Sequence, residues 1–215
     1  MKKTLTIALV ALAALAFSQP ADAVPPLQVV LLGGSFDSSS ETWIGTSDSF
    51  DLRVVAAFPG QRSAPPIDAW VMVSTLASES GTITIGGSSA VAPPSFSIPS
   101  SLISHSPAGD PAMVHHFYHI GNLGSTGLVA DYNTDGFGTV GAASNPGEQV
   151  DLAVAISGYS FAHFDAVGDD ADGTVWFAPY SHDSEFVPEP GTLSLLGAGL
   201  LGLIPALRRK RKKVE

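Results

Sequence analysis

Oxygen-bearing side chains alternate with other residues in one short segment, where Asp131, Asn133 and Asp135 stand ahead of a glycine. Carboxylate and amide oxygens are the ligands that calcium prefers in proteins, and the backbone carbonyl of Phe137 would add a further oxygen at the next alternate position. The spacing therefore predicts a calcium-binding loop.

The segment starts like a calcium loop of the EF-hand type and then departs from that pattern. Ala142 stands at the twelfth position, where such a loop has a bidentate glutamate, and no helix is expected on either side. Asp, Asn and Gly are also typical of a tight connection between strands, so a plain turn is the alternative interpretation.

A second acidic group comprises Asp165, Asp169, Asp170 and Asp172. Carboxylates this close in sequence repel one another unless water or a cation neutralises them. Calcium at Asp169, Asp170 and Asp172 is one interpretation, and a solvated loop is the other. Oxygens from both acidic segments would have to meet at one point to form a shared calcium site.

Three histidines, His115, His116 and His119, could in principle bind zinc. On a strand, however, His115 and His119 share a face and lie about 13 Å apart, which is too far for one ion. The neighbouring β-branched and aromatic residues favour a strand here, so zinc is not expected. For His163 and His182, packing or hydrogen bonding is the expected role.

The chain is not expected to be an enzyme. It has no G-x-S-x-G elbow for a serine nucleophile and no H-E-x-x-H zinc motif. Two carboxylates at a suitable separation would still be able to cleave a glycosidic bond. The glutamates available for such a pair are Glu41, Glu79, Glu148 and Glu185.

Tryptophans with exposed faces would stack on sugar rings and would suit a carbohydrate-binding module. Core packing is the more usual role of a tryptophan on a strand. The three tryptophans of the chain are Trp43, Trp70 and Trp176.

The elements that must position these residues are short strands. Apolar and polar residues alternate, with many β-branched and aromatic types, between turn-forming Gly, Pro, Asn and Asp residues. Strands are predicted at 27–32, 41–44, 50–58, 67–76, 82–85, 113–120, 149–157, 161–166 and 174–178. The pattern predicts an all-β fold over residues 24–186, a single antiparallel β-sandwich of the jelly-roll type. The Pro/Ser-rich segment 88–111 is expected to be a long loop of that body.

Charge is unevenly distributed along the chain. Its 215 residues include 10 Lys and Arg against 20 Asp and Glu, and eight of the ten bases lie at the two ends. Residues 24–187 contain 17 acids and only two bases, Arg53 and Arg62. Such a body attracts cations and lacks the basic surface that phosphate binding requires, so nucleic acid is excluded as a partner. The absence of cysteine excludes disulfides and thiolate chemistry.

Residues 1–23 have the order of a secretory signal peptide. A positive start is followed by an apolar run and by the small residues Ala21 and Ala23, which predicts cleavage ahead of Val24. The secretion translocon is therefore an expected partner, and the mature protein is expected outside the cytoplasm. A buried N-terminal helix is the alternative.

The C-terminal segment, residues 187–215, combines Pro188, Glu189 and Pro190 with an apolar run and a basic end. The apolar residues 192–207 would form a helix about 24 Å long, which a thin membrane accepts. The basic residues that would stop transfer on the cytoplasmic side are Arg208, Arg209, Lys210, Arg211, Lys212 and Lys213. A single-pass anchor that stays in place is one interpretation of this tail.

This three-part tail resembles the PEP-CTERM sorting signal of exported bacterial proteins. The resemblance implies that an exosortase, a membrane-embedded cysteine protease, cuts near Pro188, Glu189 and Pro190. It also implies transient membrane anchoring through residues 192–207. The body would then be delivered to the cell surface or to the extracellular polysaccharide of a Gram-negative-type bacterium.

The body resembles the choice-of-anchor N family in several short segments. Members of that family join a similar body to differing sorting tails, and no activity is assigned to the body. The segments that carry the resemblance lie at 23–25, 27–28, 41–43, 50–52, 157–160, 163–166 and 177–183. Residues 78–145 show no match to it.

These observations together predict an exported surface or matrix protein whose body has a structural or exopolysaccharide-associated role. A calcium-dependent carbohydrate-binding module is the alternative. No cofactor is required by the sequence, and calcium is the one metal that it favours.

Overall fold

The structure is a computed structural model that describes residues 26–61, 64–100, 102, 113–179 and 182–188. The predicted signal peptide, the apolar segment 192–207 and the basic tail lie outside the described residues, as do Glu189 and Pro190. Among the residues that are described, no helix is long and apolar enough to cross a membrane.

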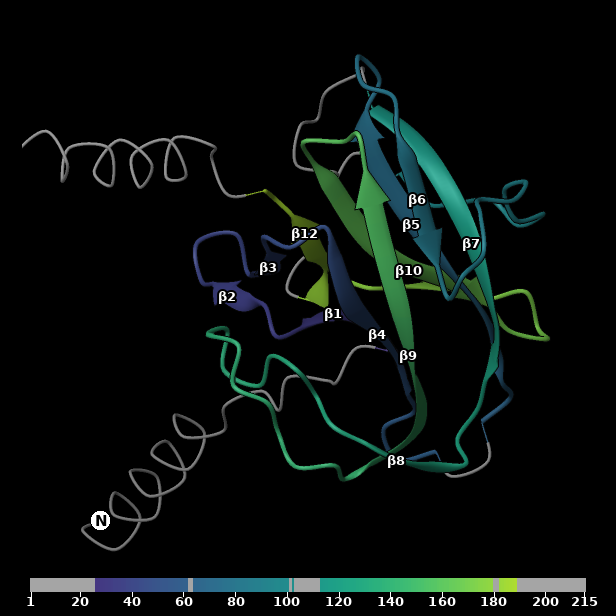
Figure 1. The fold of residues 1–215 in the computed structure, drawn as a ribbon. Coiled ribbons are helices and arrows are strands. Elements are labelled where there is room, and N and C mark those ends of the chain that lie inside the picture. Colours follow the sequence, from purple (N-terminus) through teal and green to yellow (C-terminus); the bar gives the residue numbers. More distant parts are fainter. Residues whose placement is uncertain (1–25, 62–63, 101, 103–112, 180–181, 189–215) are drawn as a thin grey trace, which may run out of the picture.

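The described residues form strands in two sheets (Figure 1). The strands are β1 (Leu27–Leu32), β2 (Ser35–Asp37), β3 (Thr42–Gly45), β4 (Ser49–Ala57), β5 (Ile67–Leu76), β6 (Thr82–Ile85), β7 (Met113–Leu123), β8 (Gly127–Val129), β9 (Asn145–Ser157), β10 (Ala162–Asp169), β11 (Val175–Phe177) and β12 (Ser184–Phe186). The all-β prediction is confirmed for this part of the chain.

The first sheet has the order β1-β4-β9-β6, with β8 paired to β9. The second has the order β2-β3-β12-β10-β5-β7, with β11 paired to β10. The prediction of a purely antiparallel arrangement is wrong at one place, because β12 runs parallel to β3, with Ser184 opposite Trp43. A parallel neighbour requires a long connection, and here most of the body separates the two strands in sequence.

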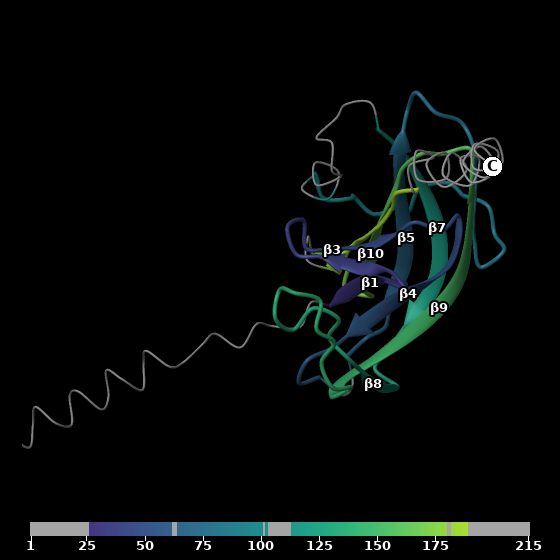
Figure 2. The same cartoon turned by 60° about the vertical axis from the view of Figure 1, so that its left-hand side comes forward.

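The main hydrophobic core lies between the two sheets, which pack face to face (Figures 1 and 2). Val29 and Val54 come from the first sheet, Val71 and Phe164 come from the second, and all four are fully buried. Side chains on a strand alternate between faces, so every second residue of β10 enters this core. The two-sheet arrangement fits a β-sandwich.

The outer face of the second sheet carries a smaller core. Met72 and Val167 on this face pack with Leu102, Phe96 and Ile98 of the segment that follows β6. These three residues of the stretch predicted as a loop therefore cover part of the outer face of the sheet. Val167 of β10 is buried under this cover, and seven consecutive residues of β10 are buried, on both faces of the strand.

An ion pair links the two central strands of the first sheet. The guanidinium of Arg53 on β4 donates two hydrogen bonds of 2.6 Å to the carboxylate of Asp151 on β9, and a third to the hydroxyl of Tyr132. Arg53 lowers the pKa of Asp151 below its ordinary value of about 4. A group with a depressed pKa contributes stability that is present above that value and lost as the pH falls.

Replacing Arg53 with methionine removes its charged hydrogen bonds to Asp151 and is expected to lower the free energy of unfolding by about 1–2 kcal/mol at pH 7. The loss is modest because Asp151 is half exposed, so that solvent screens part of the interaction. The difference should shrink below about pH 4, where Asp151 becomes protonated. Urea unfolding of the wild type and the variant at pH 7 and at pH 3 measures the loss of stability and its dependence on pH. Asp68→Asn, which affects the exposed pair of Asp68 and His119, is the control and should cost less than about 0.5 kcal/mol. A difference that does not depend on pH would contradict the role of Asp151.

Candidate functional site

The first predicted calcium segment forms a loop between β8 and β9 whose oxygens accept hydrogen bonds. Asp131 Oδ1 accepts from His182 Nε2 at 2.8 Å and from the backbone N–H of Asn133 at 3.1 Å. Asn133 Oδ1 accepts from the N–H of Gly138 at 2.9 Å. Asp131 and Asn133 are buried, so these two side chains shape the loop from within.

The outer half of the same loop has a comparable pattern. Asp135 Oδ1 accepts from the backbone N–H of Phe137 at 2.8 Å and of Thr139 at 3.1 Å. Gly138 has a φ of 80° and lies so close to Phe36 on β2 that a Cβ atom would come within 2.4 Å of the ring, so a glycine is required there. These bonds are those of a compact turn, while calcium binding at Asp131, Asn133, Asp135 and Phe137 stays a prediction.

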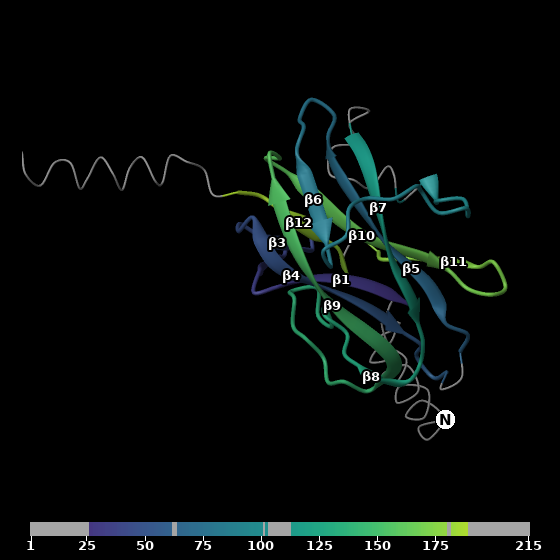
Figure 3. The same ribbon diagram turned by 45° about the vertical axis from the view of Figure 1, so that its right-hand side comes forward.

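The second acidic segment lies at the end of β10 and in the loop to β11. Asp170 Oδ1 accepts from the N–H groups of Asp172 and Thr174, each at 3.0 Å, and Oδ2 accepts from Trp176 Nε1 at 3.0 Å. The loop between β10 and β11 lies on the opposite side of the molecule from the loop between β8 and β9 (Figures 1 and 3). The structure therefore does not bring the two acidic segments to one shared ion.

The three histidines of β7 contact three different partners. His115 Nδ1 lies 2.9 Å from Ser74 Oγ, and His116 Nε2 lies 3.2 Å from Thr75 Oγ1. His119 Nε2 lies 2.7 Å from Asp68 Oδ1, and its ring packs on Trp70 with centroids 4.6 Å apart. They are strand residues, as predicted, and they do not gather around one point.

The remaining aromatic and glutamate candidates also have structural contacts. All three tryptophans are half-buried. Trp43 packs edge-on against Phe36 with ring centroids 5.4 Å apart. Glu79 accepts from the backbone N–H of Ser160 at 2.9 Å, and Glu148 accepts from the N–H of Gly124 at the same distance.

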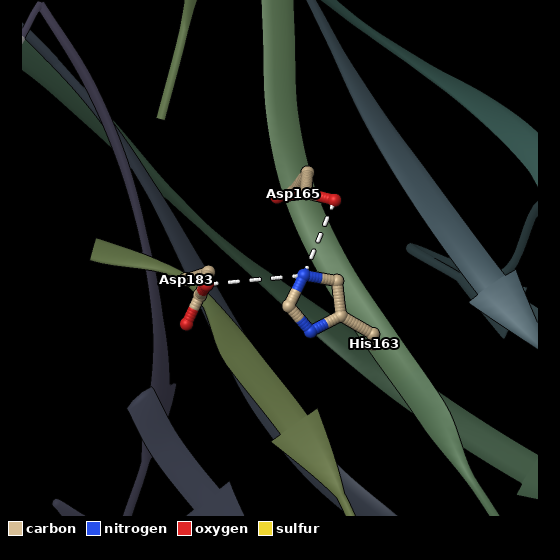
Figure 4. Close-up of side chains that lie close together, drawn as sticks. All are labelled: His163, Asp165 and Asp183. Atoms are coloured by element: carbon tan, nitrogen blue, oxygen red, sulfur yellow. Dashed lines mark ion pairs between the residues drawn. The ribbon is translucent and has the colours of Figure 1, made fainter. Parts of the chain in front are cut away.

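A buried cluster of titratable side chains lies on the outer face of the second sheet, at β10 and β12. His163 and Asp165 are two residues apart on β10, so both side chains point to this face. The strand register places Glu185 of β12 directly opposite His163. Asp183 directly precedes β12 and reaches the same imidazole from the neighbouring segment (Figure 4).

The imidazole of His163 is at the centre of this cluster. Its Nε2 lies 3.3 Å from Asp165 Oδ2 and 3.8 Å from Asp183 Oδ2 (Figure 4), and its Nδ1 lies 3.2 Å from Glu185 Oε1. The side chains of His163, Asp165 and Asp183 are at most 2% exposed, and that of Glu185 is 14% exposed. Three carboxylates therefore surround one imidazole where water has little access.

Burial by itself lowers the pKa of His163, but Asp165, Glu185 and Asp183 more than offset that effect and raise the pKa to about 10. Even a protonated imidazole is outnumbered by the three carboxylates. No lysine occurs in residues 24–187, and the guanidinium of Arg53 is bound to Asp151. Among the described residues, His163, Asp165 and Asp183 form the one group whose ligand atoms lie close enough together to hold a metal ion.

Sequence reasoning assigned packing or hydrogen bonding to His163 and did not assemble this cluster. The signal that was available is the alternation of His163 and Asp165, since a His-x-Asp triplet on a strand puts both side chains on one face. The contribution of Asp183 and Glu185 depends on β12, which was not among the predicted strands.

The predicted sorting motif begins where the folded body ends. β12 ends at Phe186, and the N–H of Val187 still donates to the carbonyl of Gly45 at 2.9 Å. Pro188 follows and lines a surface hollow of about 520 Å³ together with Tyr159 and Phe186. Pro188, the first residue of the predicted motif, therefore lies two residues beyond the second sheet.

Residues 186–212 match the PEP-CTERM protein-sorting motif. The match includes Pro188, Glu189, Pro190 and the apolar segment 192–207 and continues into the basic tail. It confirms the predicted sorting signal and indicates an exported protein that is membrane-anchored before an exosortase processes it at the membrane. No curated protein and no solved structure matches the chain. The resemblance of the body to the choice-of-anchor N family has no support from these comparisons.

Proposed function

We propose that this protein is a structural component of the cell surface or extracellular matrix of a Gram-negative-type bacterium. Its acidic β-sandwich body is exported by the translocon, held briefly in the membrane by its tail and released by an exosortase. The observation that carries the proposal is the position of the PEP-CTERM motif, which starts at the last residue of the last strand of the body.

The contacts of the candidate zinc-binding histidines and of two candidate catalytic glutamates support a structural body. The histidines of β7 are bound to neighbouring strand residues, and Glu79 and Glu148 accept backbone hydrogen bonds. Such contacts fix side chains within the fold. An association with acidic extracellular polysaccharide is also proposed, because the acidic body concentrates divalent cations, which can bridge two anionic polymers.

One surface feature favours a second candidate function, a carbohydrate-binding module. A hollow of about 470 Å³ is lined by Tyr159, Tyr118 and His116 together with the hydroxyl groups of Thr82 and Thr84. Aromatic faces beside hydroxyl groups suit sugar rings. A glycan array with and without calcium separates the two functions, since calcium-dependent binding that Tyr159→Ala removes would favour the module.

Processing of the tail is the test of the proposed function. The protein recovered from its native envelope is expected to begin at Val24 and to end near Pro188, which mass spectrometry of the intact chain measures. Glu189→Ala is expected to retain the tail, because the protease loses its recognition motif. Glu215→Ala, the same change outside the motif, is the control and should be processed normally. A wild-type chain that still ends at Glu215 would overturn the sorting proposal.

A further inference from the structure

We propose that His163, Asp165 and Asp183 bind one divalent transition-metal ion of the zinc type, and that this ion fastens β12 to β10. The site is distinct from both acidic loops that the sequence favoured for calcium. It is also independent of the sorting function, because it lies within the folded body.

The spacing of the three donor atoms fits a single small ion. The distances of 3.3 Å and 3.8 Å from His163 Nε2 to Asp165 and Asp183 exceed the roughly 2.7–2.9 Å of a charge-assisted hydrogen bond. Ligand atoms bound tetrahedrally at about 2.0–2.2 Å from zinc are separated from one another by about 3.4 Å. The distances between the donor atoms of the cluster are therefore close to those expected between zinc ligands.

Glu185 orients the imidazole from its other side. A histidine that binds metal through one nitrogen usually gives its other N–H to a carboxylate or carbonyl, which fixes the tautomer and the ring orientation. Glu185 Oε1 lies 3.2 Å from Nδ1, so Nε2 is the nitrogen that faces Asp165 and Asp183. Glu185 is therefore a positioning residue of the site.

Charge balance is an independent argument for a cation. Buried carboxylates are costly unless a positive charge or several hydrogen bonds compensate them. The body has two arginines and no lysine; Arg53, on the first sheet, is bound to Asp151 and Tyr132, and Arg62 lies outside the described residues. A divalent ion would add positive charge to a cluster in which three carboxylates surround one imidazole.

The donor set favours zinc over calcium. Calcium takes six to eight oxygen ligands, whereas this site offers one imidazole nitrogen and carboxylates from two aspartates. Zinc accepts nitrogen and oxygen donors and needs four ligands, so a water molecule or a second carboxylate oxygen would complete its shell. Bonds to residues on both segments would hold β12, which pairs with β10 through three residues only.

The first measurement is metal binding by the full-length chain, purified in detergent and stripped with a chelator. Equilibrium dialysis against zinc chloride is expected to give one tightly bound zinc ion per folded chain and a raised thermal midpoint. Manganese should bind more weakly, following the usual order of divalent affinities, and calcium should not compete. A folded chain that binds no zinc at micromolar concentration would overturn the proposal.

Variants locate the ion. Asp165→Asn and Asp183→Asn keep the side-chain volume and are expected to lose stoichiometric binding, while Glu185→Gln should weaken zinc affinity about 10–100-fold. Asp131→Asn, at a buried aspartate bonded to His182, and His119→Asn, at an exposed histidine, are the controls and should bind as the wild type does. Binding that survives both Asp165→Asn and Asp183→Asn, or that is lost in a control, would overturn the assignment.

A second readout does not depend on the folding of any variant. Zinc-edge X-ray absorption of the wild-type protein is expected to show a shell of nitrogen and oxygen donors at about 2.0 Å with the outer-shell signature of one imidazole. A shell without an imidazole contribution would place the ion elsewhere and overturn the proposal.

Discussion

Replacing His163 with leucine is expected to lower the free energy of unfolding of the metal-free protein by about 3–5 kcal/mol. The reason is electrostatic, because the change removes the imidazole that Asp165, Asp183 and Glu185 surround. The side chains of Asp165 and Asp183 are at most 2% exposed, so water screens their charges poorly. Urea unfolding at pH 7 in the presence of a chelator measures this cost. A loss below about 1 kcal/mol would contradict the role of His163 as the compensating group.

The control for this prediction removes the imidazole together with Asp165 and Asp183, the two most buried carboxylates of the cluster. Combining His163→Leu with Asp165→Val and Asp183→Val replaces a buried ionic group by apolar side chains, which is often neutral or stabilising. The triple variant is therefore expected to recover most of the stability that the single variant loses. A triple variant as unstable as the single one would indicate that packing volume, and not charge, sets the cost.

Replacing Phe164 with alanine is expected to cost about 3–5 kcal/mol for a different reason. Phe164 is fully buried in the core between the sheets and packs edge-on against Phe50, with ring centroids 5.7 Å apart. Its removal leaves a cavity that strand residues on both sides cannot close. The measurement is again urea unfolding, with the slope of the transition compared between variants.

Phe137→Ala is the matched control for this core variant. Phe137 is 73% exposed in the Asp131 loop, so its removal should cost less than about 0.5 kcal/mol. Equal effects at Phe137 and Phe164 would contradict the assignment of the core. His163 and Phe164 are neighbours on β10, and the expected losses arise from opposite faces of the same strand.

Much of this fold is readable from local pattern. The predicted bounds of β1, β5 and β6 are those observed, because apolar residues alternate or run continuously up to a clear turn signal in each. β7 extends beyond its prediction to Leu123, past an irregularity at Gly121, whose φ of 102° favours glycine. A prediction from side-chain alternation ends the strand at such a bulge, because the extra residue interrupts the alternation.

The three strands that were missed, β2, β8 and β12, have three residues each, and two of them show why local pattern did not predict them. β12 consists of Ser184, Glu185 and Phe186, which have no apolar alternation, and it is held between β3 and β10. β8 pairs with the first residues of β9, where Asn145, Pro146 and Gly147 were expected to form a turn. Tertiary pairing outweighs local propensity in both cases.

The candidate site likewise has one part that the sequence could predict and one part that depends on tertiary pairing. That His163 and Asp165 share a face follows from strand geometry alone. Asp183 joins them because β12 lies beside β10. No local sequence pattern specifies that these two segments are neighbours in the sheet. The acidic loops were found by composition, and the structure adds that their oxygens accept hydrogen bonds from within each loop.

Few residues lie between β12 and the predicted membrane segment, which limits how far the anchored body can lie from the membrane. Five residues, 187–191, separate Phe186 from Thr192, where that segment begins, and a fully extended chain covers about 20 Å between these two residues. Before cleavage the folded body is thus held within about 20 Å of the predicted membrane segment. A processing enzyme must work in a gap narrower than a protein domain, so it has to reach the cut site from within the membrane plane.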